Sequence, residues 1–289
     1  LVDDPSLPSG RRVELPLEGL PGQTRPEALR LSDGFSAGGA LLAYFPGASV
    51  TGVATPDSIP ASLQADSPTV LLQADTLERV PHFAELDMSD PEDPQQAFMI
   101  RPTVRLKDET RYIVAIRNLV DLQGVPLEAS PAFTALRDGS DSEEPSVNAG
   151  RALYEELFDS LQEADVAREE LLLAWEFTTA SAENNTRWML SMRDEALAEV
   201  REAGPDYRID QVQDDVDAHI ARRIDLTMTV PLYLDDPGPG GRLVLDDQGM
   251  PIRQGTADYP VVITIPHAAR EAARLLDARL AHAPMGFVR

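Results

Sequence analysis

Apolar side chains recur in short runs, separated by turn residues, along the first 180 residues of the chain. These runs predict strands at residues 40–45, 68–72, 97–100, 110–116 and 171–179. Turn residues predict a hairpin turn at 75–79 and a tight turn at 121–124. Short strands with frequent turn signals favour a β-sandwich.

The strand at 110–116 carries a tyrosine in a distinctive setting. Tyr112, Val114 and Ile116 share one face of an extended strand, because side chains alternate with a period of two. Leu106 precedes Tyr112 across a charged turn. This arrangement resembles the tyrosine corner of Greek-key sandwiches, in which the tyrosine hydroxyl bonds to upstream backbone. The alternative is an ordinary half-buried strand, and neither interpretation indicates any chemistry.

Helical spacing interrupts the strand pattern before its last run. Leu153, Leu157 and Leu161 repeat every fourth residue, with Tyr154 and Phe158 beside them, which predicts a helix over 149–164. Asp165 is placed to cap a further short helical turn.

The strand at 171–179 and the segment after it predict two buried stripes. Alternating Leu, Leu, Trp and Phe place Trp175 in the core, where replacement by Ala costs roughly 3–5 kcal/mol. Ser181 is predicted to cap a helix that runs to about Ala203, since Gly204-Pro205 stops it. The buried side of this helix is predicted to comprise Trp188, Met189, Met192, Leu197 and Val200.

The last third of the chain returns to a strand pattern. Strands are predicted at 207–212 and 224–234, and a hairpin at 242–253. The near-continuous apolar run at 260–266 is typical of a buried strand. An Ala- and Arg-rich segment at 268–280 predicts a helix.

Together these elements predict a mainly β protein: an Ig-like Greek-key sandwich with a helical insertion and a linker helix, plus a second, smaller β module. We expect an extended Pro- and Gly-rich segment at 1–35, a sandwich at 36–180 with its insertion at 145–168, a linker helix at 181–204, a β module at 205–266 and a helical tail at 267–289.

Composition narrows the classes of partner and compartment. The chain carries 49 acidic and 25 basic residues, a net charge of −24, and no cysteine. Repulsion from phosphates disfavours nucleic acid and anionic membrane surfaces, and the missing thiols exclude disulfides and cysteine nucleophiles. No run of about 18 apolar residues is present, so no membrane span is expected. Because the chain starts at Leu1 without a leader, we expect either a mature form or an excised part of a longer protein. We expect a removed signal sequence and an extracellular, periplasmic or outer-surface location.

One motif suggests a nucleophile and is weighed against its context. Gly34-Phe35-Ser36-Ala37-Gly38 matches G-x-S-x-G, which in hydrolases follows a strand and opens a helix. Here no strand precedes the motif and an apolar strand follows it, so a loop role is favoured for Ser36. No Gly-rich nucleotide cradle occurs. The sequence therefore assigns no catalytic, cofactor-binding or metal-binding residue.

Histidines and acidic clusters are the remaining candidates for chemistry. No metal-ligand pair of the H-E-x-x-H type involves the four histidines, His82, His219, His267 and His282. Calcium binding by loop carboxylates is the open alternative to a solvated acidic surface at three clusters, Asp214-Asp215-Val216-Asp217, Asp235-Asp236 and Asp246-Asp247.

Several segments carry a resemblance to known families. Pro102-x-x-x-Leu106, Thr110–Val114, the Asp-x-x-Gly-x-Pro-Leu turn at 121–127 and Trp-x-Phe-Thr-Thr at 175–179 resemble Ig-like domains of bacterial surface proteins. Segments at 33–36, 41–46 and 188–197 resemble secreted proteobacterial lipase-like proteins of the virulence-factor lipase type. In those proteins an N-terminal β region precedes an α/β-hydrolase domain.

The chain departs from that family where catalysis would begin. The family has a Gly-His-Gly segment of oxyanion type after the strand that corresponds to Val261–Ile265, whereas here Pro266 is followed by Ala- and Arg-rich sequence. The family's catalytic Ser, His and Asp have no counterparts, so no catalytic role is carried over.

The expected function is therefore that of a non-catalytic Ig-like accessory or interaction module of a secreted or surface lipase-like hydrolase. Its expected partner is an α/β-hydrolase domain or a cell-surface molecule. A free-standing adhesion or carbohydrate-binding module is the first alternative, and exposed aromatic side chains in line on one sheet face would favour it. A complete small serine hydrolase is the second.

Overall fold

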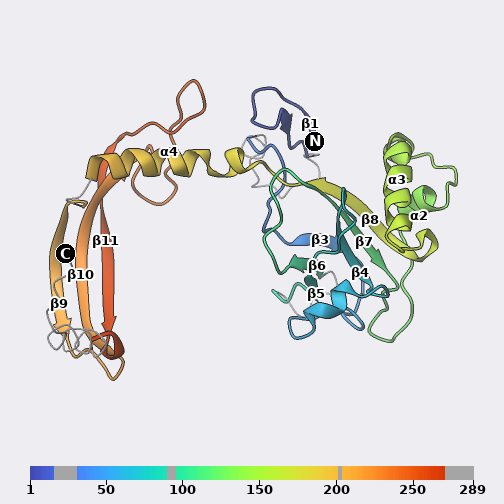
Figure 1. Cartoon of the computed structure of the whole chain (residues 1–289), viewed down its shortest axis with the longest axis horizontal. Helices are drawn as coiled ribbons and strands as arrows, with labels where there is room; N and C mark the ends of the chain where they lie inside the picture. Colours follow the sequence, from blue (N-terminus) through green and yellow to red (C-terminus); the bar gives the residue numbers. More distant parts are fainter. Residues whose placement is uncertain (16–30, 90–95, 201–203, 271–289) are drawn as a thin grey trace, which may run out of the picture. The chain divides into compact units, whose positions relative to one another are not determined.

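The computed structural model describes residues 1–15, 31–89, 96–200 and 204–270 (Figure 1). The chain is mainly β and contains several small antiparallel sheets. It divides into two compact units, Leu1–Asn185 and Thr186–Arg289, here called unit 1 and unit 2. The division falls within the helix that we predicted as a linker at 181–204.

Unit 1 is built on two three-stranded antiparallel sheets. The first has the order β3-β6-β5, formed by Leu41–Tyr44, Ala97–Pro102 and His82–Leu86. The second has the order β4-β7-β8, formed by Thr69–Gln73, Arg111–Arg117 and Leu171–Thr178. These elements confirm the strands predicted in the first 180 residues.

A turn carries the chain from one sheet to the other. The Leu77 N–H donates to the carbonyl of Gln73 at 2.8 Å, and Leu77 itself has a left-handed φ of 57°. Arg79 bridges briefly back to Leu72, but the following strand, β5, pairs with β6. The predicted turn at 75–79 is therefore confirmed, although its return strand joins the opposite sheet.

The two sheets share one apolar core. Leu71 from β4, Phe98 and Ile100 from β6, and Val114 and Ile116 from β7 are all 0% exposed and belong to the same cluster. Burying a side chain of this size stabilises the fold by about 1.5–3 kcal/mol. This shared cluster holds the sheets face to face.

Tyr112 closes one end of that core. Its side chain is 2% exposed, its ring stacks on Phe177 at 5.7 Å, and its hydroxyl accepts a hydrogen bond of 2.9 Å from the Lys107 backbone N–H. The bond to upstream backbone is the one that the tyrosine-corner pattern predicts.

Two helices cover the other face of the second sheet. α2 (Pro131–Arg137) and α3 (Pro145–Glu163) pack on a second apolar cluster. Ile113 of β7 and Leu157, Phe158 and Leu161 of α3 lie in this cluster. The helix predicted at 149–164 is confirmed and begins earlier, at Pro145.

The structure corrects three predictions for this part of the chain. Trp175 packs against the core shared by the two sheets but is only partly buried, because β8 is an edge strand and the ring lies at its open side. Leu153 is 45% exposed, since α3 turns it away from the sheet. Asp165 takes a left-handed φ of 60° just past the end of α3 and does not cap the next helical turn.

The remaining elements in the described part of unit 1 are short. They are β1 (Val2–Asp3), β2 (Arg11–Arg12), η2 (Ile59–Leu63) and η3 (Arg168–Glu170). The buried carboxylate of Asp33 accepts hydrogen bonds from the backbone N–H groups of Ser9, at 3.2 Å, and Ser181, at 3.0 Å. One side chain thus ties the N-terminal segment to the end of the unit.

Helix α4 (Ala182–Val200) begins as predicted. The Asn184 N–H donates to the Ser181 hydroxyl at 3.0 Å, which confirms the N-cap. The predicted buried stripe is wrong: none of the residues of α4 is buried, and Met189 and Leu197 are 66% and 58% exposed.

No described helix is both long enough and apolar enough to cross a membrane.

The sheet of unit 2 has the order β9-β10-β11, formed by Tyr207–Asp214, Ile220–Leu232 and Gly255–Pro266. These elements confirm the strands predicted at 207–212, 224–234 and 260–266. The helix predicted at 268–280 lies mostly outside the described residues.

Loops of unit 2 are fastened to α4 by two side chains. The Trp188 indole N–H donates to the Gly249 carbonyl at 2.7 Å. The buried Tyr233 hydroxyl donates to Glu195 at 2.8 Å. Gly249 lies in the turn of the hairpin predicted at 242–253, which is held by short bridges.

Candidate binding surfaces

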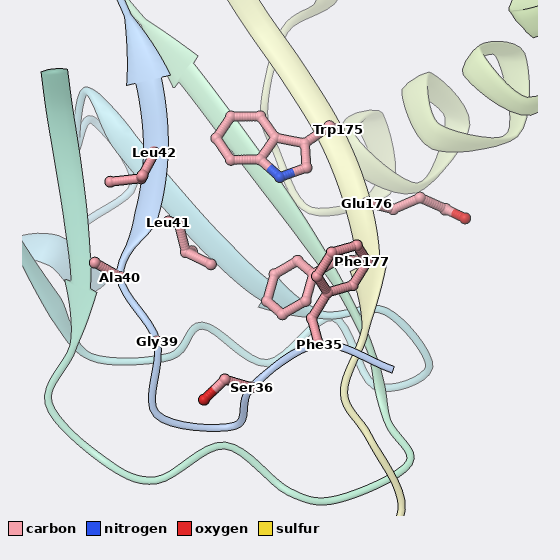
Figure 2. A pocket seen from close by; sticks show the side chains of 9 residues that line it. All are labelled: Phe35, Ser36, Gly39, Ala40, Leu41, Leu42, Trp175, Glu176 and Phe177. Carbon is pink, nitrogen blue, oxygen red and sulfur yellow. The ribbon is translucent and has the colours of Figure 1, made fainter. Parts of the chain in front are cut away.

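An apolar groove opens at one side of unit 1, between the edge strands β3 and β8 (Figure 2). Its volume is about 300 Å³. Figure 2 shows the side chains of Phe35, Leu41, Trp175 and Phe177 gathered around it, whereas Glu176 points away from them. The walls are therefore aromatic and aliphatic, which suits an apolar ligand group.

Ser36 lies at the lower end of this groove but lacks the partners of a nucleophile. Its hydroxyl accepts a hydrogen bond of 3.2 Å from the Gly38 N–H, and Figure 2 shows it directed away from the aromatic rings. Among the described residues no histidine or carboxylate bonds to it. A serine without a base nearby stays a weak nucleophile.

Gly34, the first glycine of the same motif, has a structural role. A Cβ at this position would lie 2.5 Å from the Ala180 nitrogen and 2.5 Å from the Thr179 carbonyl carbon. Gly38, the last glycine, has open space around it. The glycine at position 34 thus permits a close approach of two backbone segments and forms no strained turn around Ser36.

His82 lies inside the protein and is engaged on both ring nitrogens. It is 0% exposed; its Nδ1 lies 2.8 Å from the Val80 carbonyl, and its Nε2 lies 2.9 Å from the Thr69 hydroxyl. Because a carbonyl only accepts, Nδ1 carries the proton and Nε2 accepts from Thr69. Burial lowers the pKa of His82 below its usual range. The neutral ring serves the core and has no path to a substrate.

The acidic clusters close turns with their carboxylates. Asp217 accepts from the N–H groups of His219 and Ile220, and Asp246 accepts from those of Gln248 and Met250, at 2.7–2.8 Å. These bonds hold the pKa of Asp217 below its usual range. Within the described ranges, no group of three or more potential ligand side chains is arranged for a metal ion.

Asp214 and Asp235 are also engaged. Asp214 forms an ion pair with Arg222 at 2.7 Å, and this guanidinium keeps the pKa of the carboxyl low. Asp235 accepts from the Arg242 N–H at 2.8 Å. The structure therefore assigns turn-forming bonds to carboxylates of all three clusters that we considered for calcium.

A polar hollow of about 430 Å³ lies elsewhere in unit 1. Its charged side chains include Arg137, Glu169 and Glu170. Arg137 pairs with Asp138 at 2.7 Å, and Glu170 pairs with Arg117 at 2.7 Å. Because these ion pairs already engage Arg137 and Glu170, the hollow is a weaker candidate than the apolar groove.

A further candidate surface among the described residues is one face of the β9-β10-β11 sheet. The strand register places apolar residues opposite one another on all three strands. The face consists of three central cross-strand rows, Val212–Ile224–Ile263, Ile209–Leu226–Val261 and Tyr207–Met228–Tyr259.

Most of this apolar face is open in the described part of unit 2. Of the nine side chains in the rows, Leu226 alone is buried, at 6% exposure. On the flanking strands, Tyr207 is 64%, Val212 47% and Ile263 43% exposed. Contiguous apolar surface of this kind marks interaction sites on soluble proteins.

A bulge in β9 creates the continuity of this face. The apolar residues Ile209 and Val212 are three apart, which would place them on opposite faces of a regular strand. The register shift between Asp225 and Leu226 leaves Asp210 without a partner opposite, so both apolar residues face the same way. Asp210 accepts a hydrogen bond from the Thr227 hydroxyl at 2.7 Å.

The opposite face of this sheet is polar. Gln213, Arg223 and Thr264 form one cross-strand row there, and Arg223 pairs with Asp225 at 2.9 Å. The sheet is thus amphipathic. The run at 260–266 is almost continuously apolar because Val262, on the polar face, is apolar like the residues of the apolar face. The prediction of a buried strand is wrong, since Val262 is 53% exposed.

Sequence reasoning missed both surfaces. The groove joins Phe35 and Leu41 to Trp175, which lie far apart in the chain. The apolar face had a signal in the alternation over 224–234, which we did not extend to β9 and β11.

No known protein family, curated protein or solved structure matches the chain.

Proposed function

We propose that the chain is a non-catalytic interaction module of a secreted or surface-exposed lipase-like hydrolase. In this proposal, unit 1 is an Ig-like Greek-key sandwich, and unit 2 packs its sheet against the α/β-hydrolase domain. The two antiparallel sheets around one core and the backbone bond to Tyr112 support the Ig-like assignment.

The open apolar face of β9-β10-β11 is the observation on which the interaction role rests. A three-stranded sheet with one apolar face needs a covering layer, because exposed Val, Ile and Leu side chains are stabilised when another element removes them from water. Val212 and Ile263, at the two ends of the cross-strand row through Ile224, are about half exposed. A partner that covers both sides of this row satisfies that need.

The surroundings of Ser36 support a non-catalytic role. Acyl transfer by serine requires a base within hydrogen-bonding distance and donors aimed at the oxyanion. The described contact of the Ser36 hydroxyl is the Gly38 N–H, which donates to it. We expect no turnover of p-nitrophenyl esters by the purified chain; turnover that disappears in Ser36→Ala would refute the non-catalytic role.

A carbohydrate-binding role is the alternative, and one observation bears on it. Tyr207 and Tyr259 flank Met228 on the apolar face, which provides two aromatic rings on one sheet. The neighbouring rows are aliphatic, and aliphatic side chains neither stack on sugar rings nor bond to hydroxyl groups. The face as a whole therefore favours a protein surface.

The identity of the partner is tested by the coding sequence and by association. The reading frame beyond Arg289, or an adjacent gene, is expected to encode an α/β-hydrolase domain. That domain, purified separately, should bind the chain and fail to bind an Ile263→Asp variant. A hydrolase domain that binds both chains equally, or the absence of any such domain, contradicts the proposal.

A further inference from the structure

The free edge of β8 in unit 1 is already paired at one point. The Phe35 N–H donates to the Thr178 carbonyl at 2.9 Å, and the Ala180 N–H donates to the Phe35 carbonyl at 2.8 Å. The two segments run parallel at this bridge. In a parallel pairing the residues before Phe35 would continue along β8 toward Glu176, but among the described residues no further backbone bond joins the two segments. After Phe35 the chain enters β3 of the other sheet, so the pairing at this edge is confined to Phe35.

The next outward-facing residue of β8 is Glu176. Backbone groups of successive residues point to opposite edges of a strand, so the N–H and C=O of Glu176 point in the same direction as those of Thr178, away from β7. The described residues include no backbone partner for Glu176 on this side. One donor and one acceptor are therefore available, spaced as in a β-ladder.

The apolar groove lies beside these free groups. Its lining includes Glu176 itself together with Leu41 and Trp175 on either side. An extended peptide that pairs with Glu176 projects alternate side chains toward the groove, because strand side chains alternate between faces. The backbone edge and the groove are the two components of recognition by strand addition.

We infer that this edge and groove bind an extended peptide segment from a partner, with an apolar side chain in the groove and basic or neutral flanking residues. The net charge of −24 favours cationic over acidic peptides. The Glu176 carboxylate does not enter the groove; it pairs with Arg111 at 3.3 Å. This site is separate from the apolar face of unit 2 and does not depend on the proposed function.

Tryptophan emission provides a direct test. The chain has two tryptophans, so Trp188→Phe leaves Trp175, in the groove wall, as the single reporter. The probe is a blocked heptapeptide with alternating Val, Thr and Phe and a Lys at each end. We expect a saturable blue shift of the emission. A peptide of the same sequence with N-methylated amides, which cannot pair with the strand, should give none.

Matched variants distinguish binding in the groove from nonspecific binding to the protein surface. Phe35→Ala removes one wall and should weaken peptide binding about tenfold, since loss of an aromatic anchor costs more than 1 kcal/mol. Tyr44→Ala, at an exposed β3 position outside the groove, should leave the affinity unchanged. Equal effects of the two variants would overturn the assignment of the groove.

Amide exchange in the wild-type chain tests the strand pairing independently. Peptide binding should slow hydrogen exchange of the Glu176 N–H. Binding without that protection, equal binding of the N-methylated peptide, or no binding at all would overturn the inference. A blue shift that grows with protein concentration in the absence of peptide would show that a second copy of the chain occupies the groove. That result would overturn the assignment to a partner's peptide.

Discussion

Gly34 and Gly38 belong to one motif and experience opposite constraints. Gly34 lies against the backbone of Thr179 and Ala180, where a methyl group has no room, whereas Gly38 faces open space. Packing thus requires a glycine at the first position of the motif G-x-S-x-G, where a larger residue would clash with backbone. This requirement depends on residues far along the chain, so the motif alone could not predict it.

A pair of alanine substitutions tests this difference. Gly34→Ala should lower the free energy of unfolding of unit 1 by about 2–3 kcal/mol, because backbone must move to accommodate the Cβ. Gly38→Ala should leave it unchanged or raise it by about 0.5 kcal/mol, because alanine restricts the unfolded chain. Urea titration measures both. Equal destabilisation would contradict the close approach at Gly34.

His82 predicts a pH dependence with a definite sign. Its folded-state pKa lies below the ordinary value of 6.5 because of burial, so the unfolded chain binds the proton more readily. The free energy of unfolding should therefore fall as the pH drops below 6.5, by at most about 1.4 kcal/mol per pH unit for this group.

The control for this prediction is His82→Phe, which cannot titrate. The variant should be less stable at neutral pH, because the Thr69 hydroxyl loses its partner, and should show a shallower loss of stability between pH 6.5 and 5. Parallel curves for wild type and variant would show that His82 does not contribute to the acid-side loss.

Strands and helices were predictable where local periodicity and burial coincide. β7 alternates cleanly around Tyr112, and α3 repeats its leucines every fourth residue. α2 was missed because it is only seven residues long, and its signal is a single cap: Ser130 accepts from the Phe133 N–H at 3.2 Å. The alternation in β8 correctly indicated which face carries Trp175 but could not show that β8 is an edge strand, where the ring lines an open groove.

The attachment of α4 to the loops of unit 2 could not be predicted from periodicity, because it depends on single contacts of Trp188 and Tyr233 between distant parts of the chain. Burial and the neighbouring Glu195 carboxylate raise the pKa of Tyr233 to about 12. Tyr233→Phe should lower the free energy of unfolding of unit 2 by about 1–2 kcal/mol, since a hydrogen bond to a charged acceptor is lost.

Alkaline titration provides the matching control for Tyr233. The folded chain keeps the phenol proton between pH 10 and 12, whereas the unfolded chain releases it, so the stability of wild-type unit 2 should fall above pH 10. The Phe variant should lack this component. An unchanged alkaline slope in Tyr233→Phe would contradict the bond to Glu195.

Two compact units in one chain predict two unfolding steps. Each unit has its own sheets and hydrogen-bond network, so calorimetry should resolve two transitions. Gly34→Ala should shift one and Tyr233→Phe the other. A single transition that both variants shift equally would show that the units fold as one.

The whole chain combines a well-buried unit 1 with a sheet in unit 2 that exposes one apolar face. Composition and strand pattern predicted β architecture in both, because these depend on local sequence. They did not predict the open face, because the apolar pattern of a strand is the same whether its covering layer belongs to the same chain or to a partner. The run at 260–266 illustrates this ambiguity.

The most direct test of the interaction role is the binding of Nile red, an uncharged dye that the net charge of −24 does not repel. The chain should enhance Nile red fluorescence, and a Val212→Asp/Ile263→Asp variant on the apolar face should abolish most of that enhancement. Gln213→Asp/Thr264→Asp, with the same added charge on the polar face, should retain it. Equal dye binding by the two variants, or none by the wild type, would contradict an open apolar face.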